Sequence, residues 1–98
     1  MSFVAISKVR YPSCLKDQIH EFCLEMLPMA KLQPRFISIR FHQSQERNET
    51  MMYWEWGSQS DHEACMQSKD WCVLMDKSGS LLQSGGVEFT IKTYERLA

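Results

Sequence analysis

Four stretches of the chain alternate apolar and polar positions with the period of a β-strand. A strand that buries one face places apolar side chains at every second position, and β-branched and aromatic residues favour it. The predicted strands are residues 3–11 (FVAISKVRY), 35–43 (RFISIRFHQ), 50–57 (TMMYWEWG) and 87–95 (VEFTIKTYE). Pro12 prevents easy continuation of the first strand. The polar stretch SQERNE joins the second and third strands as a hairpin.

A first amphipathic helix is predicted after Ser13, which is a suitable N-cap. Apolar side chains recur there at the three- and four-residue spacing of one helix face. They are Leu15, Ile19, Phe22, Cys23 and Met26. Pro28 is expected to kink or end this helix, because proline removes a backbone donor and clashes with the carbonyl of Leu24.

A second helical region is predicted between the hairpin and the last strand. Ser60 and Glu63 have the spacing of a capping box. Apolar residues follow at helical intervals, namely Ala64, Cys65, Trp71, Cys72 and Met75. The region forms one helix or two pieces that meet near Asp70. Residues 78–86 (SGSLLQSGG) then form a loop with at most one helical turn.

The order of these elements, β-α-β-β-α-β, predicts a single domain over residues 1–98. Right-handed crossovers through the two helices give a split βαβ pair, so we predict an α+β, ferredoxin-like fold with an antiparallel sheet. The first and third strands are apolar on both faces, whereas the helices cover only one. A second copy of the sheet is the simplest cover for the other face. We therefore expect a homodimer.

Composition and charge narrow the range of partners and compartments. Hydrophobic residues make up 44% of the chain, and the net charge is -1 with no cluster of Lys or Arg, so neither nucleic acid nor a membrane surface is an expected partner. The N-terminus does not resemble a signal peptide, and we expect a cytoplasmic protein. Cys14 and Cys23 lie about 13 Å apart if both are helical, too far for a disulfide. Reduced thiols are expected, and no spacing suggests a zinc site.

These elements, with a hairpin that ends in YxxW, resemble the antibiotic biosynthesis monooxygenase family over nearly the whole chain. The clearest local piece is YWEWGSQSDHEACMQSKDW, residues 53–71. The resemblance implies a dimeric α+β barrel with a pocket between the sheet and its helices, with Trp56 near the pocket entrance and Trp71 on the second helical piece. It also implies oxygenation of a small aromatic or quinol-like compound without a cofactor or metal.

The chain departs from the family at several positions. Many members carry a histidine nine residues after the strand-end aromatic and a second one five residues later, and here those positions are Cys65 and Asp70. Relatives that degrade haem use an asparagine, a tryptophan and a histidine where this chain has Ser7, Cys65 and Met75. An isomerase-like activity and a haem cofactor are therefore disfavoured. Arg35 replaces the glycine that usually precedes the second strand.

Six residues are candidates for a site. Trp56, Trp71 and Tyr53 are predicted to form an aromatic box, with Tyr53 or His42 assisting proton transfer. Ser7 is either a pocket hydroxyl or bonded to the backbone, and Cys65 is either a pocket lining residue or a small buried side chain. Aromatic residues at such positions also fill ordinary cores.

Two further functions compete with the monooxygenase. One is a non-catalytic dimeric module that binds a small molecule or acts in a stress response. The other is an RNA-binding sheet, which the acidic Glu55 and the lack of a basic residue in TMMYWEWG disfavour. His20 and His62 lie on the polar side or first turn of the predicted helices, so solvent exposure is expected for both.

Overall fold

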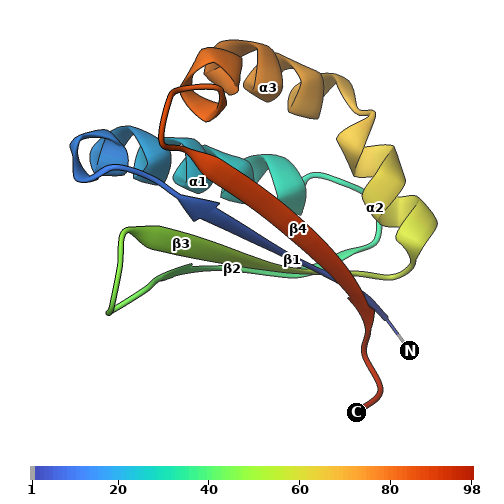
Figure 1. Cartoon of the computed structure of the whole chain (residues 1–98). Helices are drawn as coiled ribbons and strands as arrows, with labels where there is room; N and C mark the ends of the chain where they lie inside the picture. Colours follow the sequence, from blue (N-terminus) through green and yellow to red (C-terminus); the bar gives the residue numbers. More distant parts are fainter. Residues whose placement is uncertain (1) are drawn as a thin grey trace.

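The sheet is antiparallel and has the strand order β2-β3-β1-β4, which confirms the predicted ferredoxin-like arrangement (Figure 1). It is seen in a computed structural model that describes residues 2–98. The strands are β1 (Phe3–Arg10), β2 (Phe36–Gln43), β3 (Glu49–Trp56) and β4 (Glu88–Glu95). The two termini meet at one end of the sheet, where the Arg96 amide donates to the Ser2 carbonyl over 2.9 Å.

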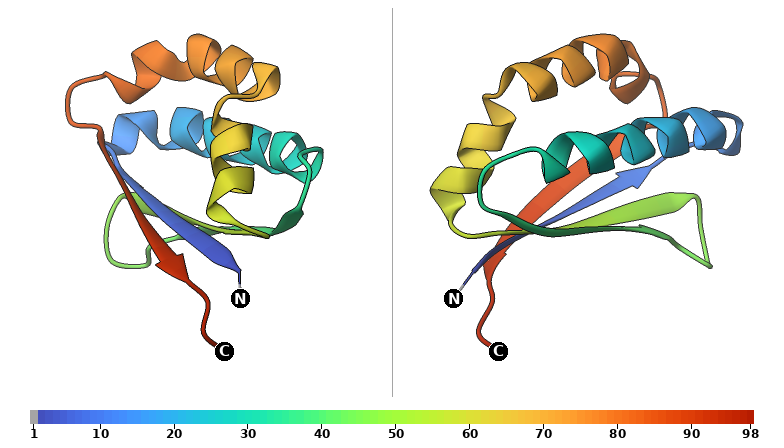
Figure 2. Two further views of the ribbon diagram at one scale, coloured as in Figure 1. Left: turned by 90° about the vertical axis from the view of Figure 1, so that its right-hand side faces the viewer. Right: turned by 180° about the vertical axis from the view of Figure 1, so that it is seen from behind.

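The helices form one layer on one face of the sheet, and the other face is left uncovered by the described residues (Figure 2). A 3₁₀ turn at Ser13–Leu15 precedes α1 (Lys16–Lys31). α2 (Gln59–Met66) and α3 (Lys69–Leu82) follow β3. The single layer covers the central strands β1 and β3, whereas every residue of the edge strand β4 is exposed.

The core lies between α1 and the two central strands. α1 buries side chains at the spacing of one helix face, as the sequence predicts. They are Ile19, Phe22, Cys23, Met26, Met29 and Ala30. From the sheet, Ala5 pairs with Trp54 and Val9 with Thr50, and all four side chains are buried on the same face.

The helix boundaries differ from the sequence predictions. α1 continues through Pro28 to Lys31. Proline has no backbone N–H, so the Leu24 carbonyl lacks its usual donor within the helix. Pro28 is exposed, and this carbonyl therefore lies on the water-facing side of the helix. α3 also runs to Leu82 through the predicted loop, and the N-cap of α2 is Ser58, which accepts a hydrogen bond from the Asp61 amide. The division into two helical pieces is confirmed, with Ser68 capping the second.

Arg35 takes the backbone conformation of the glycine that it replaces. Its φ is 59°, in the left-handed region that L-residues with a Cβ atom avoid. The Arg35 carbonyl accepts a hydrogen bond from Gly57 over 3.0 Å, which joins the start of β2 to the turn after β3. The tertiary fold therefore imposes this conformation on an unfavourable residue.

Replacing Arg35 by glycine is expected to stabilise the fold by about 0.5–1 kcal/mol, because relief of the left-handed strain exceeds the added flexibility of the unfolded chain. The ion pair with Asp61 is 4.0 Å long and the Arg35 side chain is exposed, so its loss costs little. Urea unfolding at fixed protein concentration measures the change. Arg35→Ala removes the same charge but keeps the strain and should bring no gain. An equal gain in both variants would contradict this explanation.

Candidate functional site

The two predicted proton-transfer residues lie on the uncovered face of the sheet. Tyr53 pairs with Ile6 of β1 and Arg40 of β2, and His42 pairs with Met51. Alternation along the strands directs all these side chains away from the helices. Tyr53 and His42 are therefore separated by the sheet from any site between the sheet and its helices.

The four predicted binding residues lie on the helix side. Ser7 is buried on β1, Cys65 is buried on α2, and Trp71 is partly buried on α3. Trp56 is fully buried, so its expected place at a pocket entrance is wrong. The predicted box of Trp56, Trp71 and Tyr53 does not form either, because Tyr53 faces the opposite direction.

An aromatic cluster, formed by Phe3, Phe36, Trp54, Trp56, His62 and Trp71, occupies the layer between the sheet and the start of α2 and α3. Trp54 and Trp56 stack with ring centroids 6.3 Å apart. The His62 ring lies 5.3 Å from Phe3, 6.0 Å from Trp56 and 6.2 Å from Trp54. Trp71 meets Trp54 edge-on at 5.9 Å.

Three ring nitrogens in this cluster are buried without a hydrogen-bond partner among the described residues. They are Nε1 of Trp54, Nε1 of Trp56 and Nε2 of His62. A buried polar atom left unpaired costs about 1–3 kcal/mol, and few such atoms occur in a domain of this size. All three atoms belong to rings of the aromatic cluster.

The burial of His62 contradicts the expectation that it faces solvent. Its side chain is 7% exposed, because α2 packs its first turn onto β1 and β3. A helical signal was available in the sequence: His62 precedes Cys65 by three residues and therefore shares its face. Assignment to the first turn alone did not reveal which side of α2 meets the sheet.

Burial changes the chemistry of two side chains on α2. It lowers the pKa of the His62 imidazole below its ordinary value, and the neighbouring Glu63 carboxylate offsets only part of this. His62 is therefore neutral at pH 7. Burial also raises the pKa of the Cys65 thiol to about 11, which makes Cys65 a poor nucleophile and favours its reading as a small buried side chain.

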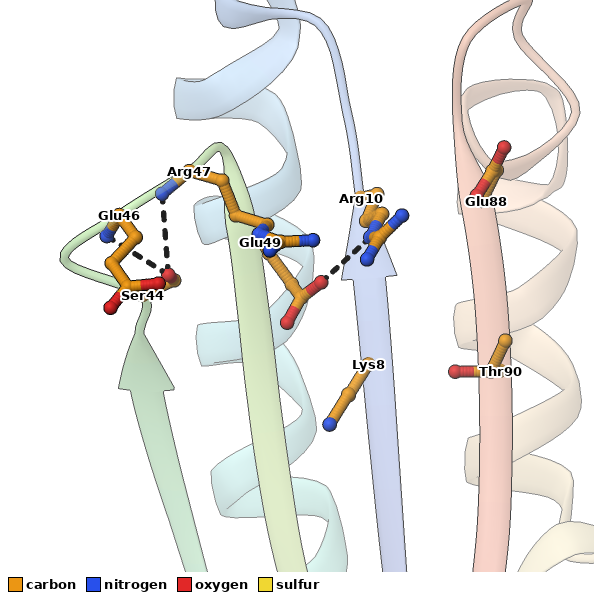
Figure 3. Close-up of a pocket in the computed structure, with 8 residues that line it drawn as sticks. All are labelled: Lys8, Arg10, Ser44, Glu46, Arg47, Glu49, Glu88 and Thr90. Carbon is orange, nitrogen blue, oxygen red and sulfur yellow. Dashed lines mark hydrogen bonds and ion pairs between the residues drawn. The ribbon is translucent and has the colours of Figure 1, made fainter.

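The centre of the uncovered face combines apolar and basic side chains, and the end toward the β2–β3 hairpin is charged. A central recess of about 310 Å³ is lined by Ile6, Met51 and Tyr94 together with Lys8, Thr90 and Lys92. The charged recess of about 540 Å³ appears in Figure 3, where Glu49 binds Arg10 at 2.8 Å. Its lining contains three basic and three acidic side chains, namely Lys8, Arg10, Arg47, Glu46, Glu49 and Glu88. This balance of charge indicates no preference for an anionic or cationic ligand.

The far end of the same face holds a buried carboxylate. Glu55 accepts hydrogen bonds from the Ser2 hydroxyl and from Arg96 Nη1, at 3.0 Å for Arg96. These bonds, the Ser2 bond foremost, lower the pKa of Glu55. Through these bonds Glu55 joins Ser2 and Arg96, near the two ends of the chain, to β3. We assign the three side chains a structural role.

Comparison with known proteins defines the fold. No family model and no curated protein matches this chain. Among solved structures, Rv0793 from Mycobacterium tuberculosis superposes with a TM-score of 0.84 at 11% identity, covering 100% of this chain and 97% of that one. An antibiotic biosynthesis monooxygenase superposes with a TM-score of 0.82 at 9% identity, covering 98% of this chain and 99% of that one. The fold is that of the antibiotic biosynthesis monooxygenases.

A third structure agrees with this assignment of the fold. A Deinococcus radiodurans protein described as a candidate antibiotic biosynthesis monooxygenase superposes at a TM-score of 0.82 with 7% identity, covering 98% of this chain and 93% of that one. Among residues 2–98, no three His, Cys, Asp or Glu side chains are grouped as metal ligands would be. None of the helices in that range is long and apolar enough to cross a membrane.

The burial of neutral His62 predicts a dependence of stability on pH. Its pKa is lower in the folded than in the unfolded protein, so the unfolded state binds the proton first and stability falls as pH drops below the ordinary value near 6.5. Urea unfolding at pH 7.5, 6.5 and 5.5 should show a smaller fall for His62→Phe than for the unmodified chain.

Glu63→Gln provides the matched control. Glu63 is the charge that raises the pKa of His62, so removing it should steepen the loss of stability at low pH. Identical pH profiles for the unmodified chain and His62→Phe would show that His62 does not titrate as described.

Proposed function

We propose that this protein is a cofactor-independent monooxygenase that binds a small aromatic or quinol-like compound at the aromatic cluster. The observation that carries the proposal is the group of unpaired ring nitrogens inside a buried aromatic layer. The monooxygenase-like fold supports the same location between sheet and helices. Flat ligands are recognised by such layers through aromatic contacts and a few placed polar groups.

The chemistry makes few demands on the protein. A deprotonated phenol, anthrone or quinol can pass an electron to O₂ directly. For an anthrone, one oxygen atom replaces two hydrogens on carbon and the other leaves in water, so the substrate supplies all the electrons. The protein must hold the ring, exclude water and stabilise an oxyanion. The indole N–H groups of Trp54 and Trp56 are donors of the required kind.

This reaction predicts oxygen consumption by chelator-treated protein when an anthrone and quinol panel is supplied. Trp71→Ala should raise KM about 2- to 10-fold, because the variant loses the aromatic edge that contacts Trp54. An oxygen electrode and chromatography of the products measure both effects.

Val73→Ala is the matched control for this variant. Val73 lies on the same helix and is 58% exposed, so its truncation should leave turnover unchanged. Absence of oxygen uptake with every compound, together with absence of binding, would refute the proposed function.

A non-catalytic module that binds a small molecule is the second candidate. The observation in its favour is that Cys65 is a buried thiol with a raised pKa at a position where the family often has a histidine. Thermal-shift screening with the same panel separates the two candidates. Saturable stabilisation without product formation would favour the binding module.

We also propose a homodimer in which the uncovered sheet faces of two copies stack on each other. The centre of this face exposes Ile6, Met51 and Tyr94 beside two lysines, and its charged end carries both signs, which suits a self-complementary two-fold contact. In this arrangement Tyr53 and His42 belong to the dimer interface. The four free thiols fit a reducing compartment such as the cytoplasm.

Ile6→Glu is expected to convert the dimer to a monomer, because it places an unpaired charge at the centre of the stacked sheets. Sedimentation velocity at micromolar concentration measures the change. Leu24→Glu, at an exposed position on α1, is the control and should leave the dimer intact. A monomeric unmodified chain at this concentration would refute the dimer.

A further inference from the structure

The central recess of the uncovered face lies over β1, β3 and β4 and has a volume of about 310 Å³. A recess of this volume is large enough for a small organic ligand. Its lining combines two lysines, two residues with hydroxyl groups and two apolar side chains. They are Lys8, Lys92, Thr90, Tyr94, Ile6 and Met51. The recess therefore differs from the charged recess beside it, because none of the described residues that line it is acidic.

Lys8 on β1 and Lys92 on β4 are neighbours on this face. Lys8 pairs with Thr90, two residues before Lys92, so the two lysines are diagonal neighbours across the strands. Diagonal neighbours lie about 7–8 Å apart, within reach of long side chains. Figure 3 shows Lys8 and Thr90 projecting on the same side of the sheet. Within residues 2–98, neither lysine forms an ion pair.

The nearby carboxylate of Glu49 is already engaged by another residue. It binds the Arg10 side chain at 2.8 Å. The hydrogen bond from Arg10 is the main cause of the lowered pKa of Glu49, and Lys8 contributes least among the cations that lower it. Two like charges on adjacent strands repel each other. The central recess therefore has room for a negative charge that would be stabilised by both lysines.

Protection of a sheet edge explains only one of the two lysines. A lysine on an edge strand hinders pairing with another chain, and Lys92 lies on the edge strand β4. Lys8 lies on β1, which is paired on both sides, with β3 and with β4. Edge protection therefore accounts neither for Lys8 nor for the recess that both lysines line.

Stacking of two uncovered faces would increase the need for a negative charge. Lys8 and Lys92 of both copies would then lie between the sheets, where an ammonium group without a partner is costly. A carboxylate bound in each recess would supply the opposite charge inside this interface.

We infer that the central recess binds a small carboxylate with an apolar body, such as a medium-chain fatty acid. Lys8 and Lys92 hold the carboxylate, and Ile6 and Met51 contact the apolar body. The site lies on the opposite side of the sheet from the aromatic cluster, so it does not depend on the proposed monooxygenase activity.

Titration calorimetry with octanoate, octanamide and acetate tests the inference. Octanamide has the size of octanoate without its charge, and acetate has the charge without the alkyl chain. We expect saturable binding of octanoate, at least about 10-fold tighter than that of either comparison compound, because octanoate alone makes both the charge-assisted hydrogen bonds and the apolar contacts. Equal affinity for octanoate and either comparison compound, or no saturable binding, would overturn the inference.

Lys8→Gln and Lys92→Gln should each weaken octanoate binding about 10-fold and leave octanamide binding within about 2-fold of the unmodified chain. Both lysines are exposed, so both variants are expected to fold. Lys31→Gln is the matched control, because Lys31 is an exposed lysine on α1, in the helix layer. It removes the same charge and should retain full affinity for octanoate. An equal loss of affinity in all three variants would indicate a general effect of net charge and would contradict the site.

Two adjacent methionines locate the ligand in the unmodified chain. Met51 lines the recess, whereas Met52 is 2% exposed and faces the helices. In spectra of ¹³C-labelled methionine methyl groups, octanoate should shift the Met51 signal and leave the Met52 signal unchanged. A shift of Met52 alone would place the ligand between the sheet and its helices and would overturn the inference.

Sedimentation velocity on the same samples separates this inference from the proposed dimer. Octanoate binding that depends on both lysines in a monomeric chain would support the carboxylate site and refute the dimer. A dimer that binds octanoate and octanamide equally would support the dimer and refute the carboxylate site.

Discussion

A single layer of helices covers one face of the sheet, and this constraint assigns every strand side chain to one of two environments. On β3, Trp54 and Trp56 face the helices while Tyr53 faces away. The burial of one large side chain stabilises a fold by about 1.5–3 kcal/mol. A slip of one residue in the pairing would move the whole aromatic set to the open side. The register that forms the core is therefore the same one that forms the aromatic cluster and the open face.

The strands could be predicted from the sequence because their signal is local. The observed bounds of all four strands agree with the predicted ones to within about a residue. The ends of α1 and α3 could not be predicted in the same way, because they depend on which side of each helix faces the sheet and which faces water. Pro28 is tolerated because it lies on the water-facing side of α1, and the Gly- and Ser-containing segment of α3 is held as a helix in spite of its weak propensity.

The site was only partly predictable for the same reason. The resemblance to the family placed Trp56 and Trp71 at a pocket between the sheet and its helices, and the structure places both side chains in that layer. His62 was missed because its burial depends on how α2 docks onto β1 and β3. The unpaired state of three ring nitrogens is a property of the assembled cluster, and no pattern along the chain encodes it.

The composition of the cluster is difficult to explain by stability alone. Phenylalanine at these three positions would supply apolar rings without a polar atom to desolvate, whereas each unpaired nitrogen costs about 1–3 kcal/mol. Domains of this size are stable by only about 5–15 kcal/mol, so three such costs are a large fraction of the total. Polar groups of the ligand proposed at this cluster would offset part of that cost.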